Sequence, residues 1–299
     1  MKLRIAENFR AVFYAPFYAI RALGLAEREG LAVEWLPSEA PGGTIGEVKR
    51  GAIDAQWGGP MRVLKDHDSP GATLVCFGEV VGRDPFYLIG RRNQPALRLQ
   101  DIGAMRLGVV SEVPTPWYCL RADLEDAGVD TAAMRKAGRL VDNLSMPQQL
   151  EALAAGKLDA VQLFEPHASR ALAEGNAMLY AASSRGPTCY TSFITSRDSA
   201  SKRRDEFAAL TRATQAVLDW LAESGPAELA RVTASFFPDV PQDLLRPAFE
   251  RYHRAGLWSR TTAVSKTGFE RLAYSLHDGG FIARRATYAE CVHDYGKPA

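Results

Sequence analysis

The chain carries one short pattern twice, as GAIDAQWGGP from Gly51 to Pro60 and as GKLDAVQLFEP from Gly156 to Pro166. Each copy begins with Gly, continues with Asp-Ala and a mostly apolar run, and ends at Pro. Gly commonly ends a helix, Asp is a frequent turn residue, and a short apolar run is typical of a buried strand. Each copy therefore predicts a helix, a tight turn and a strand, with Asp54 and Asp159 as turn residues rather than ligand groups.

The rest of the chain alternates short apolar runs with longer helical patterns, which is typical of an α/β fold with mostly parallel sheets. One helix is expected to begin at Ser145, a good N-cap residue, and to stop at Gly156. Strands are expected at residues 3–6, 31–36, 53–57, 72–78, 105–110, 158–164 and 177–181. In open α/β sheets, ligands bind beyond the carboxyl ends of the strands. The two copies of the repeated pattern therefore predict two rims of one ligand-binding cleft.

Composition excludes several classes of protein. A length of 299 residues suits two domains, and 36 Lys and Arg residues against 35 Asp and Glu leave no overall charge that would attract nucleic acid. No apolar run approaches the roughly 20 residues that span a bilayer. The four cysteines are widely scattered and form no CxxC pair, so we expect reduced, buried thiols and no metal or other cofactor. They are Cys76, Cys119, Cys189 and Cys291.

Two β-rich segments predict how the chain divides. RDPFYLIGR (Arg83–Arg91) and CYTSFITSR (Cys189–Arg197) bracket the second copy of the α/β scheme. If both segments are crossing strands, the first lobe is discontinuous and consists of residues 1–88 and 190–299, and the second lobe consists of residues 89–189. A hinge of two strands permits closure around a ligand.

Long stretches of the sequence resemble a known family. FYAPFYAIRALGLAEREGLAVEWL with the GG turn after it, VKRGAIDAQWGG, DIGAMRLGV and QQLEALAAGKLDAVQLFEP resemble ABC-type solute-binding proteins for nitrate, sulfonate, taurine and thiamine-pyrimidine precursors. The resemblance covers nearly the whole chain, and it is specific for the superfamily but weak for the ligand. It implies a two-lobed fold of the type II periplasmic-binding-protein kind. It also implies a small organic ligand, aromatic or anionic, in the cleft between the lobes, and an ABC transporter permease as a partner.

In the first lobe, candidate ligand-binding residues follow the strand ends. Aromatic side chains after the first strand offer stacking faces, although such residues also pack in cores. Gly residues at the end of a strand let a ligand approach the backbone N–H groups of the next helix. An Arg one turn further on offers a bidentate contact to a carboxylate, sulfonate or phosphate, or else is a solvated helix residue. The candidates are Phe13, Tyr14, Trp57, Gly58, Gly59 and Arg62.

Further candidates lie at the predicted hinge and in the second lobe. Glu79 and Arg83 flank the first crossing segment, where they contact the ligand or pair with each other. Glu165 accepts from an amino group of the ligand or caps its own helix. For Gln162, the sequence leaves open whether the side chain points into the cleft or into the sheet. The candidates in these two regions are Glu79, Arg83, Ser111, Thr115, Trp117, Glu165 and Tyr190.

Enzymes occur in the same superfamily, so catalysis is an alternative. The thiamine-pyrimidine synthase family is expected to use a cysteine-rich iron-binding cluster, which this sequence lacks. The aromatic sulfinate desulfinase family needs a nucleophilic Cys, for which Cys189 is a better candidate than Cys119, which we expect to face the core. We therefore expect a binding protein without catalytic residues. A leaderless enzyme or a cytosolic sensor on the same scaffold is the alternative.

The start of the sequence bears on location. MKLRIAENF passes at once into alternating apolar residues and shows no secretory signal pattern. We expect a periplasmic location if an export signal was removed from this sequence, and a cytoplasmic one for the chain as it reads.

Overall fold

The computed structural model describes residues 1–91 and 98–295 and divides the chain into two compact units. Unit 1 consists of Met1–Arg83 and the chain from Gly186 onward, and unit 2 consists of Asp84–Arg185. These boundaries precede the ones expected from the sequence, because RDPFYLIGR is not one continuous strand. The Asp84 carboxylate accepts a hydrogen bond from the Phe86 N–H (2.9 Å), and this turn separates the last strand before it from the next.

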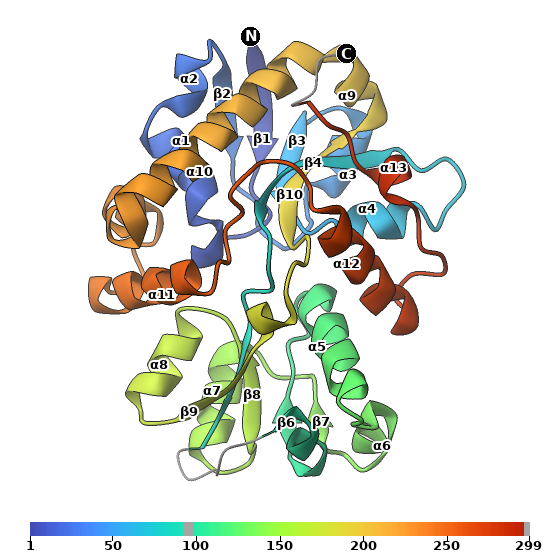
Figure 1. The fold of residues 1–299 in the computed structure, drawn as a ribbon, viewed down its shortest axis with the longest axis vertical. Helices are drawn as coiled ribbons and strands as arrows, with labels where there is room; N and C mark the ends of the chain where they lie inside the picture. Colours follow the sequence, from blue (N-terminus) through green and yellow to red (C-terminus); the bar gives the residue numbers. More distant parts are fainter. Residues whose placement is uncertain (92–97, 296–299) are drawn as a thin grey trace. The chain divides into compact units, whose positions relative to one another are not determined.

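Unit 1 is built on a five-stranded sheet of order β2-β1-β3-β10-β4 (Figure 1). β1 runs parallel to β2 and β3, whereas β10 runs antiparallel to both of its neighbours, β3 and β4. The strands are β1 (Lys2–Ala6), β2 (Ala32–Leu36), β3 (Ala55–Gly58), β4 (Leu74–Val81) and β10 (Thr191–Ser196).

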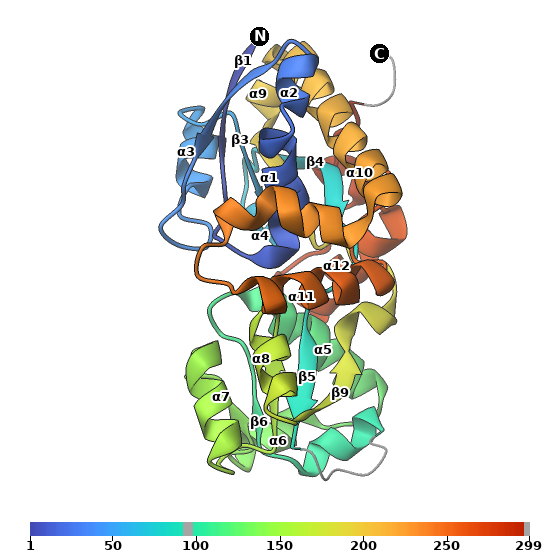
Figure 2. The ribbon, with the colours of Figure 1, turned by 90° about the vertical axis from the view of Figure 1, so that its left-hand side faces the viewer.

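Helices cover both faces of this sheet. α10 lies beside α1, and Figure 2 shows α3 on the other side of the sheet, where it packs on β3 and β10. α12 packs against α4, and α13 against β4. Their bounds are η1 (Val12–Tyr14), α1 (Ala15–Ala22), α2 (Leu25–Arg28), α3 (Ile45–Arg50), α4 (Met61–Asp66), α9 (Arg197–Lys202), α10 (Arg204–Thr233), η4 (Ala234–Phe236), α11 (Gln242–Arg254), α12 (Lys266–Asp278) and α13 (Tyr288–Cys291). α10 is kinked at Gly225, which Pro226 follows.

Unit 2 repeats the arrangement with a sheet of order β7-β6-β8-β5-β9. β6 is parallel to β7 and β8, and β5 is antiparallel to β8 and β9. The strands are β5 (Tyr87–Gly90), β6 (Leu107–Gly108), β7 (Leu140–Val141), β8 (Ala160–Leu163) and β9 (Ala177–Ala181). The helices are η2 (Leu99–Ala104), α5 (Pro114–Asp126), α6 (Thr131–Lys136), α7 (Met146–Ala154), α8 (His167–Ala173) and η3 (Ala182–Arg185).

The predicted α/β fold with two sheets is confirmed, with one addition. In each sheet, one strand runs against the others: β10 in unit 1 and β5 in unit 2. Both are the strands that the chain forms when it has just passed from one unit to the other. The apolar pattern of a buried strand gives no direction, so the sequence predicts the strands but not this reversal.

The first copy of the repeated pattern fixes β3 beside β1. α3 ends at Gly51, whose φ of 73° lies in the left-handed region that glycine adopts freely. The Asp54 N–H then donates to the Arg4 carbonyl (3.0 Å), and the Asp54 carboxylate accepts from the Arg4 N–H (2.6 Å). Asp54 also forms an ion pair with Arg203. The prediction that Asp54 is a turn residue is confirmed.

The second copy makes the same contacts in unit 2. Gly156 follows α7 with a φ of 69°, and the Asp159 N–H donates to the Arg106 carbonyl (2.9 Å). The Asp159 carboxylate accepts from the Arg106 N–H (2.9 Å), and it forms ion pairs with Arg91 and the Arg106 guanidinium. We call this exchange of backbone and carboxylate hydrogen bonds the Asp clamp. It joins β8 to β6 as it joins β3 to β1.

We predict that Asp159→Ala destabilises the protein by about 1.5 to 3 kcal/mol, because hydrogen bonds to charged groups contribute that much. The hydrogen bonds and ion pairs from Arg106 lower the Asp159 pKa to about 2. The folded-state pKa is below the unfolded one, so this stabilisation is present above about pH 4 and disappears as the pH falls toward 2. Urea unfolding at pH 7 and pH 3 measures both effects.

The matched control is Glu270→Ala, which removes an exposed pair with Lys266. The free energy of unfolding should change by less than about 0.5 kcal/mol, because exposed pairs of this kind contribute little. An Asp159→Ala protein as stable as the Glu270→Ala protein at pH 7 would contradict the structural role of the clamp.

Asp84, at the start of unit 2, and Arg185, at its end, belong to one cluster of buried charged side chains. Asp84 is 1% exposed, and one of its carboxylate oxygens, Oδ2, has no hydrogen-bond partner among the described residues. Nearby, Asp123 accepts from the Arg185 Nε (3.0 Å) and from the Tyr180 hydroxyl (2.9 Å). Burial raises the pKa of Asp84 to about 7, and this effect outweighs the hydrogen bond from Phe86 and the charge of Arg185.

We predict that Asp84→Asn makes stability less dependent on pH between 5 and 8. The folded-state pKa of Asp84 lies above the unfolded one, so the folded protein holds the extra proton and loses stability as the pH rises through 7. An amide does not ionise, so the variant avoids this loss. Melting temperatures measured between pH 5 and pH 8 test this prediction. The control is Asp198→Asn, which changes an exposed carboxylate. Identical slopes for the natural protein and Asp84→Asn would contradict the prediction.

Candidate functional site

The strand ends of unit 1 bring three distant parts of the chain to one edge of the sheet. β1 pairs in parallel with β3, with Ala6 opposite Gln56, so both strands end on the same side. β10 runs the other way and starts there, with Ser192 opposite Gly58. The loop after β1, the Gly pair after β3 and the first residues of β10 therefore meet. This is the edge at which ligands bind in α/β sheets.

Asn8, in the loop after β1, organises the polar groups at this edge. Its Oδ1 accepts from the Gly42 N–H (2.7 Å) and from the Arg62 Nη2 (3.3 Å), and its Nδ2 donates to the Tyr14 hydroxyl (3.1 Å). Gly42 has a φ of 74°, and a Cβ atom there would lie 2.2 Å from the Arg62 Nη1. Only glycine leaves room for the guanidinium in this position.

Arg62 is a mostly buried cation to which the described part of the chain supplies no counterion. Burial lowers its pKa. Within residues 1–91 and 98–295 no carboxylate forms an ion pair with Arg62, and its Nε has no hydrogen-bond partner. An uncompensated buried charge is costly, so an anion beside the guanidinium would be strongly favoured. Burial raises the pKa of Tyr14 to about 12, against the opposing effects of Asn8 and Arg62, so the Tyr14 hydroxyl keeps its proton at neutral pH.

Gln56 adds a second unused donor. Its side chain is fully buried, and its Oε1 accepts from the Thr44 hydroxyl (2.6 Å). Its Nε2 has no partner in the described part of the chain. A Cβ atom at Gly58 would lie 3.1 Å from this Nε2, so the missing side chain at Gly58 keeps the space next to the amide open. We call Asn8, Tyr14, Gln56 and Arg62 the Arg62 cluster. Its chemistry suits recognition of an anion.

Several predicted first-lobe residues meet in or beside this cluster. Tyr14 and Arg62 are part of it, Gly58 lies beside Gln56, and the Gly59 carbonyl accepts from the Arg62 N–H (3.1 Å). Phe13 is buried against Tyr14, with ring centroids 4.3 Å apart, and Tyr190 packs edge-on against Phe13 at 6.1 Å. Their contacts with a ligand stay predictions.

The Trp57 side chain lies on the opposite face of β3 from Gln56. Its indole stacks on Phe17, with centroids 5.0 Å apart and planes 7° apart, and its ring meets Trp35 at 6.0 Å. Side chains alternate across a strand, so Gln56 and Gly58 share one face of β3 while Trp57 lies on the other. Trp57 therefore lines a different space from Asn8, Gln56 and Arg62, although its ring also meets the Tyr14 ring edge-on, with centroids 6.5 Å apart.

Glu79 serves the fold at the end of β4. Its Oε1 accepts from the Ser259 hydroxyl (2.8 Å), and its Oε2 accepts from the Ser265 N–H (3.2 Å). Burial raises its pKa. Both oxygens thus hold the segment between α11 and α12, rather than standing open to a ligand. Arg83, the other predicted hinge residue, is half-buried and is the last residue of the first part of unit 1.

In unit 2, the predicted contact residues gather where β6 and β8 end. Ser111 is exposed, with its N–H 3.3 Å from a carboxylate oxygen of Glu112, and Thr115 is buried in the first turn of α5. Trp117 packs on the core of unit 2, and the Arg135 guanidinium lies 5.9 Å from its ring centre. Trp117 packs on the core, so the exposed polar residues at this point are Ser111 and its neighbour Glu112.

The two buried polar residues of β8 and its following loop have structural partners. Glu165 is fully buried and accepts from the Ser169 N–H (2.9 Å), which is the helix-capping contact expected as one alternative. Gln162 accepts from the Val110 N–H (3.1 Å) and donates to the Pro116 carbonyl (2.8 Å). Gln162 therefore joins the end of β6 to the start of α5, which settles the orientation that the sequence left open.

Sequence reasoning missed Asn8, Gly42, Thr44 and Gln56. Asn8 had a usable signal, because it is the first amide side chain after the first predicted strand. Gln56 also had one, since a polar residue inside a buried apolar run needs a partner. Gly42 and Thr44 had none beyond a turn composition, because their contacts with Arg62 and Gln56 depend on how the loop folds back over the sheet.

The cysteines do not suit thiolate chemistry. All four are free and buried, as the sequence predicted. Burial and the nearby Glu79 carboxylate raise the pKa of Cys189 well above its usual value. Burial also raises the pKa of Cys119 to about 12. A nucleophilic Cys needs a lowered pKa and access to the substrate, so Cys189 is a poor desulfinase nucleophile. Across the residues described, no group of His, Cys, Asp and Glu could hold a metal ion.

We predict that the native protein reacts slowly with a thiol reagent such as 5,5′-dithiobis(2-nitrobenzoate) at pH 8. Buried, protonated thiols are poor nucleophiles. In guanidinium chloride, all four thiols should react at once. One thiol that titrates rapidly in the native protein and is lost in Cys189→Ala would contradict this picture and revive the enzyme alternative.

Comparison with known proteins assigns the family. The model of the NMT1-like family matches residues 9–236. The chain belongs to the NMT1-like family. A relative in Bacillus subtilis (strain 168), named "Putative binding protein YtlA", is 21% identical over 98% of this chain and 87% of its own.

Solved structures show the same fold at low identity. The periplasmic aliphatic sulphonate binding protein SsuA from Escherichia coli has a TM-score of 0.78 and 17% identity, over 97% of this chain and 96% of its own. The alkanesulfonate-binding protein SsuA from Xanthomonas axonopodis pv. citri, bound to MOPS, has a TM-score of 0.73 and 16% identity, over 98% of both chains. The resemblance to ABC-type solute-binding proteins is thus confirmed. A helix long and apolar enough to cross a membrane does not occur among the described residues.

Proposed function

We propose that this protein binds a small organic anion through the Arg62 cluster, as the solute-binding component of an ABC-type uptake system. The observation that carries the proposal is the guanidinium of Arg62, which is mostly buried and has no counterion in the described chain. The family and the fold of sulfonate-binding relatives support a solute-binding role. An anion in this position would restore the charge balance that the protein alone lacks.

The donors of the cluster match an oxyanion group. The Arg62 Nε is unused, and its Nη2 makes only a long contact with the neutral Asn8. A planar guanidinium prefers two parallel hydrogen bonds to a carboxylate, sulfonate or phosphate. The Tyr14 hydroxyl and the Gln56 amide supply neutral donors beside it. Aromatic rings at Phe13 and Tyr14 would pack on the organic part of the solute.

The partner and the location follow from the same proposal. We infer an ABC permease as the partner that receives the solute. The similar SsuA from Escherichia coli is a periplasmic protein, and we propose the same compartment for this one. The cysteine chemistry favours binding over the desulfinase-like alternative, because Cys189 is buried and protonated.

We predict that organic anions raise the melting temperature and are recovered unchanged. A screen of sulfonates, aromatic carboxylates and aminopyrimidines by thermal shift finds the class, and mass spectrometry of the eluted compound checks for conversion. A ligand at 100 times its dissociation constant adds about 2.7 kcal/mol to the free energy of unfolding, which such a screen detects.

Arg62 variants test the site. Arg62→Ala should weaken binding of the anion by about thirtyfold or more, since truncating one partner of a buried charge pair costs about 2 to 5 kcal/mol. Arg62→Lys keeps the positive charge but lacks the planar guanidinium that can make two parallel hydrogen bonds, so it should retain only part of the affinity. The control is Arg246→Ala, an exposed Arg paired with Glu250. Unchanged affinity in Arg62→Ala, or a preference for an uncharged solute, would refute the proposed site. Conversion of the compound would refute the binding role.

A further inference from the structure

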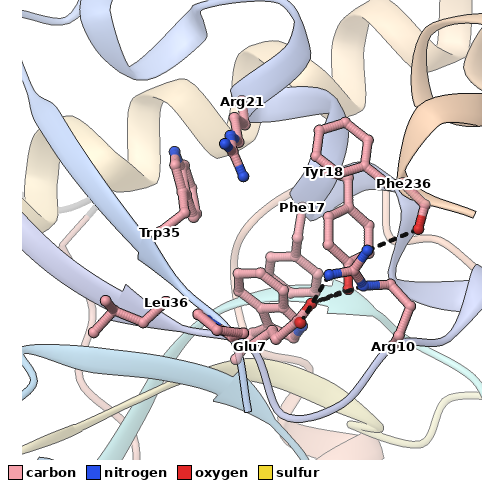
Figure 3. Close-up of a pocket in the computed structure, with 10 residues that line it drawn as sticks. Glu7, Arg10, Phe17, Tyr18, Arg21, Trp35, Leu36 and Phe236 are labelled. Carbon is pink, nitrogen blue, oxygen red and sulfur yellow. Dashed lines mark hydrogen bonds and ion pairs between the residues drawn. The ribbon is translucent and has the colours of Figure 1, made fainter. Parts of the chain in front are cut away.

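A hollow lies in unit 1 on the Trp57 face of β3, where the Trp57 ring also meets the Tyr14 ring of the Arg62 cluster edge-on (6.5 Å between centroids). It has a volume of about 90 Å³ and is lined by side chains of α1, the end of β2, β3, η4 and the loop after β1. Figure 3 shows Arg21 from α1 and Trp35 from β2 facing this hollow, with Glu7 and Arg10 on its far side. None of Asn8, Tyr14, Gln56 and Arg62 lines it.

The walls of the hollow are aromatic and well ordered by mutual packing. Trp57 stacks on Phe17 and meets Tyr18 edge-on, with centroids 5.5 Å apart. Tyr18 in turn stacks on Phe236 at 5.0 Å. Trp35 closes one side at 6.0 Å from Trp57. These rings offer flat, apolar surface to a small alkyl group.

The only carboxylate lining the hollow is already neutralised. Among its lining residues, Glu7 is the one acid, and it is 5% exposed. Its Oε1 accepts from the Arg10 Nη2 (2.9 Å), and its Oε2 accepts from the Arg10 Nε (3.1 Å) and from the Tyr18 hydroxyl. A cation in the hollow would find no free carboxylate oxygen and would face Arg10. Aromatic walls beside a carboxylate that is already paired therefore do not form a cation site.

Two donors at the hollow lack acceptors. Arg21 is exposed at the hollow; its guanidinium lies 5.7 Å from the centre of the Phe236 ring and forms no ion pair within the described chain. The Trp57 side chain is 3% exposed, and its indole N–H has no hydrogen-bond partner in the part of the chain that the structure describes. The charges of Glu7 and Arg10 cancel, so the lining residues carry one net positive charge, that of Arg21. A buried N–H donor without an acceptor indicates a missing occupant.

We propose that this hollow is a second binding site, which takes a short-chain monocarboxylate. Arg21 pairs with the carboxylate, the Trp57 N–H supplies a second hydrogen bond, and the alkyl end lies against Trp35 and Phe17. A volume of about 90 Å³ suits a short alkyl chain. No residue of the Arg62 cluster lines the hollow, although the Tyr14 ring meets the Trp57 ring edge-on.

The test is a titration of ¹⁵N-labelled Arg62→Ala protein, in which the proposed main site is disabled, and of the natural protein in parallel. The probe is sodium propionate, and the indole N–H signal of Trp57 is followed by NMR. Sodium chloride controls for ionic strength, and propylammonium chloride controls for an alkyl group of opposite charge. In both proteins, we expect propionate to shift the Trp57 signal in a saturable way, and we expect neither control salt to do so.

Arg21→Gln and Arg246→Gln separate the site from general charge effects. Arg21→Gln should weaken the propionate response by about two- to fivefold, because Arg21 is exposed, while Arg246→Gln, which changes an exposed Arg on α11, should leave it unchanged. A Trp57 signal that does not respond to propionate means that the hollow holds only water, and it overturns the proposal. So does a response that Arg21→Gln does not weaken, or one that sodium chloride reproduces.

Discussion

The Asp clamp is the contact on which the two sheets depend. In each unit, the N–H of one Asp donates to the carbonyl of an Arg in or directly before the neighbouring strand, and the Asp carboxylate accepts from the N–H of the same Arg. A parallel strand has no hairpin turn to set its register, and a shift of one residue would turn every side chain to the opposite face. The clamp removes this freedom at Asp54 and at Asp159, just before β3 and β8 begin.

Register decides what the two faces of β3 present. With Ala6 opposite Gln56, the Gln56 side chain and the open space at Gly58 fall on the face of the Arg62 cluster. Trp57, between them, falls on the face of α1, where it stacks on Phe17. One strand of four residues thus separates a polar, cationic edge from an aromatic hollow. The same alternation that builds the core also places two chemically different sites back to back.

In the Arg62 cluster, the fold positions a buried guanidinium through neutral groups. The guanidinium is fixed by Asn8 and by the close approach of Gly42, which supply position without a neutralising charge. Part of the stability of the fold offsets the desolvation of this cation. That cost would make binding of an anion more favourable, because the anion would supply a counterion that the described residues do not. The Glu7–Arg10 pair is the opposite case, a buried charge that the protein itself has neutralised.

The sequence by itself determined the helices that stop at Gly51 and Gly156, the turn roles of the two Asp residues, the two α/β units, and Tyr14 and Arg62 as candidates. Those features depend on local turn chemistry and on apolar periodicity, which neighbouring residues reveal. Only the tertiary structure decided the reversed direction of β10, the meeting of Gly42 with Arg62, and the separation of Trp57 from the cluster. The physical reason is that each depends on segments far apart in the chain. Whether a buried Arg has a counterion is a property of everything that the fold brings near it, and no local pattern records that.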